Sequence, residues 1–296
     1  MAKLNKLNLF DLTMIVIGLV IGMGIFRTSK DAAAAAHTPS LFFAAWIIGG
    51  LVAICGALTY AEIGSRYPVT GGYYKVFSYA YHPSIAFAIN CIILISNAAS
   101  LSGVALIGAE YIAPIVFDTG ATDFVKALIA MGAIIIFYGV NLMGLRMSSK
   151  TQNVLMIIKI SMIVVLISAL FFPDLYNTTP VPAVDLDQVS NGAILLSFGV
   201  ALKATSFTYG GYQQTINFGD EIQNPKKNIP RGIFIGIIVI ILLYLAVSFS
   251  YYKVIGFEEL KNPAPGSPGI AAIVAQKMFG DTGRDVSSVM LFLAVL

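Results

Sequence analysis

Seven apolar runs, each long enough to cross a membrane as a helix, determine what this sequence can fold into. They cover Asp11–Ala36, Leu41–Ile63, Ile85–Ile112, Val125–Leu145, Val154–Phe172, Ala193–Phe218 and Ile233–Tyr252. An eighth run starts near Val286 and continues to Leu296. A spanning helix needs about 20 apolar residues, and a membrane interior admits only structures that satisfy their backbone hydrogen bonds internally. The runs therefore predict an all-α integral membrane protein surrounded by a lipid bilayer.

Composition points to the same class and argues against others. The chain is 57% hydrophobic and 11% charged, whereas a soluble domain has about 25% charged residues. The net charge is +3 without a basic tract, so we expect no nucleic-acid partner. Neither the two cysteines, Cys55 and Cys91, nor the two histidines, His37 and His82, lie close together in sequence. We therefore expect no metal site and no cofactor.

The distribution of basic residues predicts the orientation, because cytoplasmic loops carry an excess of Lys and Arg. The loop after the fifth run, 173–190, has three Asp and no Lys or Arg. The short loop 224–231 has three basic residues. Both loops agree with this rule if the N-terminus lies on the cytoplasmic side. The segment 66–83, which has five tyrosines, is then expected at the cytoplasmic interface, as a turn followed by a short helix. Residues 262–280 are then an external loop that becomes helical around Ile270–Phe279.

Glycines interrupt the first and sixth runs near their middles, at Gly22-Met23-Gly24 and Tyr209-Gly210-Gly211. One interpretation is close helix packing, since small residues let two backbones touch. The other is an unwound helix, because glycine-interrupted spans at matching positions of two repeats indicate a transporter's binding site. Unwinding leaves free N–H groups that suit a carboxylate and free carbonyls that suit an ammonium group. An amino acid carries both groups on one carbon.

Three motifs resemble those of amino acid permeases of the APC superfamily, in particular the bacterial relatives of L-type amino acid transporters. The first helix contains Ile21-Gly22-Met23-Gly24-Ile25-Phe26, and the loop after the second contains Glu62-Ile63-Gly64-Ser65-Arg66-Tyr67-Pro68. The sixth helix contains Phe207-Thr208-Tyr209-Gly210-Gly211, and the loop that starts at Asp220-Glu221-Ile222 follows it. The match covers essentially the whole chain. It departs at Met23, where the family often has serine, and at Lys203.

The resemblance implies a LeuT-type fold of two inverted five-helix repeats with broken helices 1 and 6. Residues 1–172 would form the first repeat, 173–190 an external loop and 191–296 an incomplete second repeat. By the same comparison, we expect helices nine and ten and most of helix eight to lie beyond Leu296. The substrate would bind at both breaks. Its carboxylate would meet backbone N–H groups of Gly22, Met23, Gly24 and Ile25, and its amino group would meet carbonyls of Phe207, Thr208 and Tyr209, next to the unwound Gly210, with Phe207 as an outer gate.

Four of the charged residues inside the apolar runs bear on function, because a charge within a membrane needs a reason. Lys159 either extends its ammonium group to the cytoplasmic interface or, by the resemblance, takes the place of a coupling sodium ion. In the second case it could release a proton during the cycle or stay charged as a fixed latch. Lys203 and Arg27 would line a positive outer vestibule or sit in solvent, and Glu110 is expected to be an interfacial carboxylate.

These features predict a secondary transporter, a permease or an exchanger, that moves amino acids across the cytoplasmic (inner) membrane and has no enzymatic activity. The alternatives are an amine or polyamine carrier and a non-transporting amino acid sensor on the same fold. A channel is less consistent with the sequence, which has no recognisable filter segment. Proton coupling, exchange and the identity of the amino acid stay open.

Overall fold

Helices form every regular element in the part of the chain that the structure describes. The computed structural model describes residues 6–69, 71–117, 121–179, 190–264 and 269–295. The α-helices are α1 (Leu9–Val20), α2 (Gly24–Ala35), α3 (Pro39–Arg66), α4 (Gly72–Ala80), α5 (Pro83–Val116), α6 (Asp123–Leu142), α7 (Leu145–Ser168), α8 (Asn191–Thr208), α9 (Pro225–Ile255), α10 (Phe257–Lys261) and α11 (Ile270–Val295). Short 3₁₀ helices follow α7 and α8, among them η4 (Tyr212–Asn217) and η5 (Gly219–Glu221).

Six helices are long and apolar enough to cross a membrane, and α1 and α2 together make a seventh span that is bent by 50°. The six are α3, α5, α6, α9, the segment Lys150–Phe171 of α7, and Asn191–Asn217, which contains α8 and η4. This set confirms the predicted all-α membrane class and the seven predicted runs. Helix α4 lies between the second and third spans, where a short helix was expected, and the helix expected around Ile270–Phe279 is the first half of α11, which kinks at Gly280. Their sides of the membrane remain a prediction.

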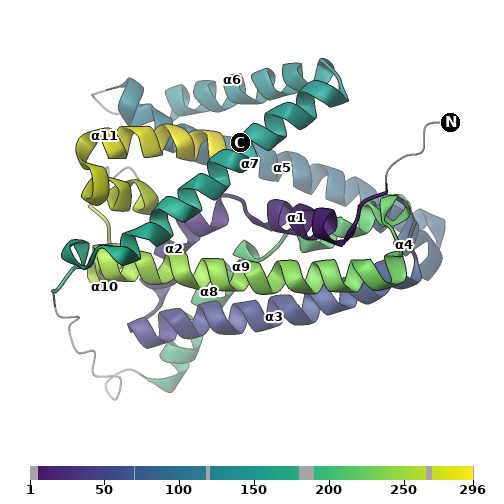
Figure 1. Ribbon diagram of the computed structural model, residues 1–296, viewed down its shortest axis with the longest axis horizontal. Helices are drawn as coiled ribbons and strands as arrows, with labels where there is room; N and C mark the ends of the chain where they lie inside the picture. The colour runs from purple at the N-terminus through teal and green to yellow at the C-terminus, as the bar shows by residue number, and fades with distance from the viewer. Residues whose placement is uncertain (1–5, 70, 118–120, 180–189, 265–268, 296) are drawn as a thin grey trace.

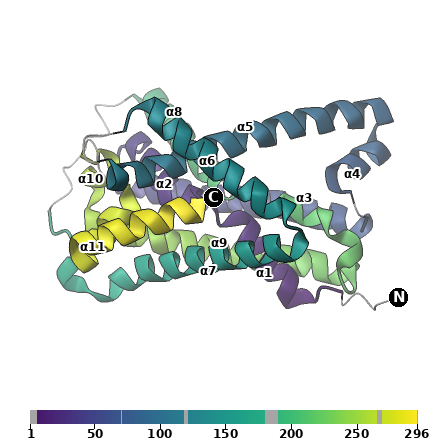
Figure 2. The ribbon, with the colours of Figure 1, turned by 90° about the horizontal axis from the view of Figure 1, so that it is seen from above.

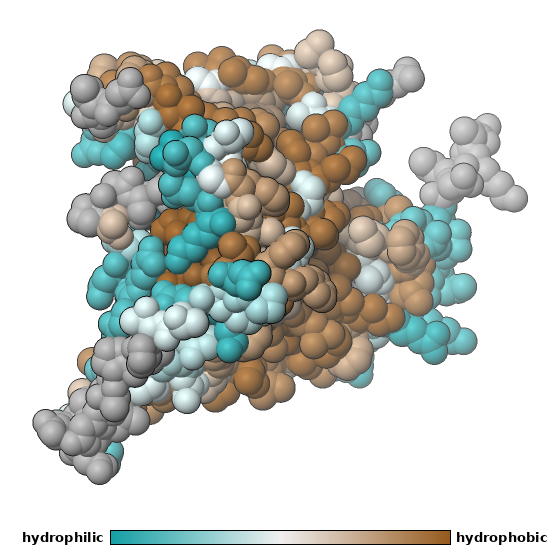
Figure 3. Space-filling model, turned by 60° about the vertical axis from the view of Figure 1, so that its left-hand side comes forward, coloured by the Kyte–Doolittle hydropathy of each residue, from teal (hydrophilic) through white to brown (hydrophobic). Residues whose placement is uncertain are grey.

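The long helices run along the longest axis of the molecule (Figures 1 and 2). Helices α3 and α9 lie side by side, and α1 packs on α9 (Figure 1). The start of α1 and α4 lie at one end, while α10 and the bend of α11 lie at the other (Figures 1 and 2). Hydrophobic side chains cover the surface between hydrophilic groups at the two ends (Figure 3), as expected for a bundle that crosses a bilayer.

Small residues determine how closely the first span approaches α9. Leu12 and Val16, one turn apart on α1, are fully buried. Leu12 lies over Gly232, and Val16 lies over Gly236. An added Cβ at either glycine would come within 2.8 Å or less of these side chains. This small-xxx-small pattern on α9 lets the two helices approach closely and holds α1, and therefore the first break, against the centre of the bundle.

Candidate substrate site at two helix breaks

The first break leaves backbone donors without partners. Helix α1 ends at Val20, Ile21 is extended, and α2 starts at Gly24. No side chain caps the start of α2. Among the described residues, the N–H groups of Gly22, Met23, Gly24 and Ile25 have no hydrogen-bond acceptor. Free N–H groups at a helix N-terminus, together with the positive end of its dipole, form a binding site for an anion such as a carboxylate.

The second break leaves backbone acceptors without partners. Helix α8 ends at Thr208, and the chain turns before it continues as the 3₁₀ helix η4. The N–H of Gly210 donates to the carbonyl of Phe207 (3.1 Å), and the N–H of Gly211 donates to Oε1 of Gln213 (2.8 Å). As a result, the carbonyls of Ser206, Thr208 and Tyr209 accept no hydrogen bond from the described residues. Such carbonyls suit an ammonium group.

The two breaks lie in contact with each other. Gly24, at the start of α2, lies against Thr208, the last residue of α8, so that an added Cβ would be 2.7 Å from Thr208 Cγ2. Gly211 lies against the backbone of Leu19 and Val20 at the end of α1. The first break, which carries the free donors, therefore touches the second break, which carries the free acceptors. This arrangement fits a ligand that carries both a carboxylate and an ammonium group.

Buried aromatic side chains brace both breaks from α3 and α9. Tyr209 is fully buried, and its hydroxyl donates to the carbonyl of Trp46 on α3 (3.1 Å). Its ring lies 5.3 Å from the ring of Tyr244 on α9 and 5.8 Å from that of Trp46. The Tyr244 hydroxyl donates to the carbonyl of Val20 (3.0 Å), which the break has freed from its helical partner. The side chain of Tyr209 thus anchors the second break and leaves its own carbonyl available.

Sequence reasoning did not select Trp46, Tyr244 or Gly211. Trp46 and Tyr244 lie inside apolar runs, where an aromatic residue is usually interpreted as part of the core. The sequence does not indicate that the Trp46 carbonyl accepts from Tyr209, or that Tyr244 donates to Val20. Gly211 did carry a signal, because it belongs to the interrupting pair in the sixth run. The structure makes it the glycine with a positive φ, +122°, that contacts the other break. Gly210 lacks a positive φ.

The other residues named from the sequence lie around the breaks with differing exposure. Thr208 and Ile25 are buried, and Gly22, Met23 and Gly24 are partly buried. Phe207, the expected outer gate, is 74% exposed and does not cover the breaks. Its gating role remains a prediction.

Lys159 lies beside the first break without contacting it directly. It lines a cavity of about 420 Å³ together with Gly18 of α1 and residues of α5 and α6. Within the described ranges, its ammonium group makes no recorded hydrogen bond to the carbonyls that the break frees. The role of a coupling cation therefore also remains a prediction.

Arg27 and Lys203 were expected to line a common positive outer vestibule, and this expectation remains a prediction. Arg27 forms an ion pair with Glu110 of α5. Lys203 lies on the exposed, apolar face of α8 beside Leu196 and Val200. The two residues belong to α2 and α8, which pack on each other.

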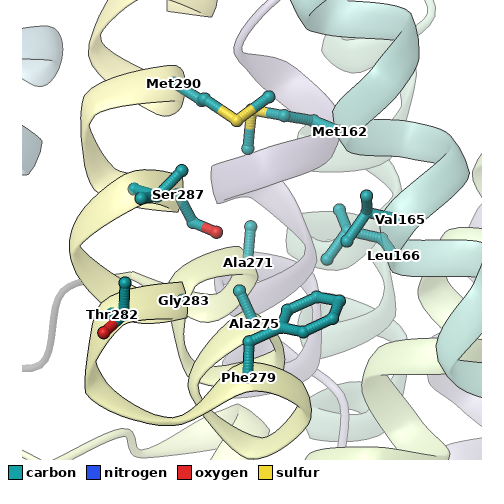
Figure 4. Close-up of a pocket in the computed structure, with 11 residues that line it drawn as sticks. Met162, Val165, Leu166, Ala271, Ala275, Phe279, Thr282, Gly283, Ser287 and Met290 are labelled. Atoms are coloured by element: carbon teal, nitrogen blue, oxygen red, sulfur yellow. The ribbon is translucent and has the colours of Figure 1, made fainter.

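A further cavity, of about 290 Å³, lies between α7 and α11 (Figure 4). Met162, Leu166 and Phe279 are among its walls, and Thr282 and Ser287 supply its only hydroxyl groups. No charged side chain lines it. It therefore has no group that could bind the charges of an amino acid, and we place the candidate site at the breaks instead.

The hydrogen bond from Tyr244 to Val20 gives a first prediction. Tyr244→Phe removes the donor and leaves the Val20 carbonyl buried without a partner, so we expect the protein to lose about 1–2 kcal/mol of stability. Thermal unfolding in detergent measures the loss. Tyr81→Phe is the matched control, because its side chain is 57% exposed. Equal melting temperatures for the two variants would remove the proposed bracing role of Tyr244.

The chain is similar in sequence to known membrane transporters. A family model described as amino acid permease matches residues 7–296. A serine/threonine exchanger of Bacillus subtilis is 26% identical over 97% of this chain and 63% of its own length. The human b(0,+)-type amino acid transporter 1 is 29% identical over 86% of this chain and 53% of its own. A methylthioribose transporter of Bacillus subtilis is 27% identical over 99% of this chain and 65% of its own length. The chain therefore spans roughly half to two thirds of the length of these relatives.

Proposed function

Because the chain belongs to the amino acid permease family, we propose that the protein is a secondary transporter, a permease or exchanger, that moves amino acids across the cytoplasmic membrane by alternating access. The observation that best supports this proposal is the contact between the two breaks. The N–H groups from Gly22 to Ile25 are free at one break, the carbonyls of Thr208 and Tyr209 are free at the other, and Gly24 lies against Thr208. Binding energy from both ends of an amino acid can then draw the two helices together, and this coupling of binding to helix movement suits a carrier.

Membrane topology is part of the proposal. The basic residues Lys75, Lys226 and Lys227 belong to α4 and to the start of α9. Helix α4 lies at the end of the bundle that also holds the start of α1 (Figures 1 and 2). An excess of Lys and Arg favours the cytoplasmic side. We therefore propose that this end faces the cytoplasm, and that α10 and the bend of α11 face outward.

Uptake into proteoliposomes tests the function. The protein expressed from its complete gene is reconstituted and given labelled serine, leucine, lysine and aspartate, and also a polyamine and methylthioribose. Saturable uptake or exchange of an amino acid supports the proposal. Flux that does not saturate indicates a channel, and binding without flux indicates a sensor. If the protein took up only methylthioribose or a polyamine, its substrate class would be different from the proposed one. Methylthioribose is included because one relative is a methylthioribose transporter.

Lys159 provides a test of the coupling mechanism. A charged ammonium group inside a membrane needs nearby oxygen atoms or a water-filled cavity, and Lys159 lines a cavity next to Gly18. We propose that it stays charged and acts as a fixed latch between α7 and α1, which gives exchange. Proton release from the same group would instead give proton-coupled uptake.

We expect Lys159→Ala and Lys159→Gln to slow transport at least about tenfold, because both remove a charge between two helices that move. Parental uptake should not respond to an imposed pH gradient. Uptake that rises with the gradient in the parent, and no longer does so in Lys159→Gln, would support proton coupling instead. Parental rates in both variants would show that the ammonium group only extends to the interface.

A further inference from the structure

An ion pair connects the two helices beside the candidate site. Arg27 of α2 pairs with Glu110 of α5, 83 residues further along the chain. The N–H of Arg27 donates to the carbonyl of Met23 (3.2 Å), so this residue lies in the first turn after the break. Helix α2 runs from the free N–H groups past Arg27 and packs on α10, so a ligand that approached along this helix would pass the pair.

The ion pair forms one wall of a polar cavity of about 140 Å³. Two cations, Arg27 and Lys30, and two carboxylates, Asp31 and Glu110, line this cavity. Tyr111, which is 5% exposed, also lines it, and Gly269, just before α11, packs against the Tyr111 ring. The charges balance, and the Arg27 and Glu110 side chains are 39% and 47% exposed, so a solute can reach both.

The balance of charges has a consequence for selectivity. A solute that separates Arg27 from Glu110 must replace the lost partner of each group, because an uncompensated charge in a partly enclosed site is costly. A zwitterion can do so, since its carboxylate meets Arg27 and its ammonium group meets Glu110. An amino acid with a further charge leaves a surplus charge of one sign in the cavity. Specificity of this kind arises from a penalty on the wrong ligand as much as from attraction of the right one.

We propose that Arg27 and Glu110 act together as a charge filter on the path to the breaks, and that they select amino acids with no net charge. The inference rests on the proposed transport function and adds a substrate class to it. The rival explanation is a mechanical one, in which the pair only holds α2 against α5. A purely mechanical tie would affect all substrates equally, whereas a filter changes the ratio between them.

The test compares Arg27→Gln, Glu110→Gln and the exchanged pair Arg27→Glu with Glu110→Arg. Uptake of alanine, lysine and aspartate is measured for the protein from its complete gene in proteoliposomes. Arg27→Gln leaves Glu110 alone and is expected to raise the lysine-to-alanine ratio about fivefold. Glu110→Gln is expected to raise the aspartate-to-alanine ratio by a similar factor. The exchanged pair restores balance and should return both ratios toward those of the parent.

Lys126→Gln is the matched control, because its ion pair with Asp123 lies within α6 alone and joins no second helix. Ligand-induced shifts of Tm in detergent give the same ratios for a variant that binds but does not transport. Unchanged ratios in both single variants, or equal losses for all three amino acids, would overturn the filter. If the parent neither binds nor transports any amino acid, the proposed function fails instead.

Discussion

Gly211→Ala is expected to destabilise the protein by about 2–4 kcal/mol and to remove amino acid binding, because this glycine is constrained in two independent ways. Its φ is +122°, and a non-glycine residue in such a conformation costs about 1–3 kcal/mol. An added Cβ would also collide with the Leu19 carbonyl and lie 3.1 Å from Val20 Cα. Both atoms are backbone at the end of α1, so no side-chain rotation relieves the collision and the two breaks must separate.

Thermal unfolding in detergent measures the first effect, and equilibrium binding of labelled amino acids measures the second. Gly199→Ala is the matched control on α8, because a Cβ there meets no atom within 4 Å. We expect it to be neutral or to stabilise the protein by up to about 1 kcal/mol, since alanine favours a helix more than glycine does. If Gly211→Ala kept both parental stability and parental affinity, the breaks would not meet at this residue.

Gly24→Leu is expected to weaken amino acid binding on the order of a hundredfold while the protein still inserts into the membrane. The added Cβ would lie 2.7 Å from Thr208 Cγ2, and the rest of the leucine side chain would enter the space next to the free N–H groups at the start of α2. The carboxylate would then lose its donors. Equilibrium binding measures the loss, and recovery from the membrane fraction shows that insertion survives.

A double variant tests whether steric crowding between residue 24 and Thr208 causes the loss of binding. Gly24→Ala brings a methyl group against the methyl group of Thr208, and Thr208→Ser removes that second methyl group. We expect the pair together to bind better than Gly24→Ala alone, as for residues in direct contact. Gly132→Leu on α6 controls for insertion, because a Cβ there has open space. Additive effects of the two changes would mean that Gly24 and Thr208 are not in contact.

Much of the fold follows from local sequence features. The seven apolar runs each became a span because a membrane helix must bury about 20 apolar residues and satisfy its own hydrogen bonds. The first span breaks where glycine lowers helix propensity, between Val20 and Gly24, and the sixth breaks after Thr208. The free N–H groups at Gly22–Ile25 were likewise predictable, since the N–H groups at a helix start lack partners within the helix.

The contacts between distant segments were decided by the tertiary structure alone. The sequence singled out Gly210, and only the contact between α1 and the segment that follows α8 places Gly211 against Leu19. The sequence also did not indicate that Arg27 pairs with Glu110. Propensity and periodicity act over a few residues of one helix. Ion pairs, bracing hydroxyl groups and close backbone approaches depend instead on how helices pack, which the interlocking of side chains from separate spans determines.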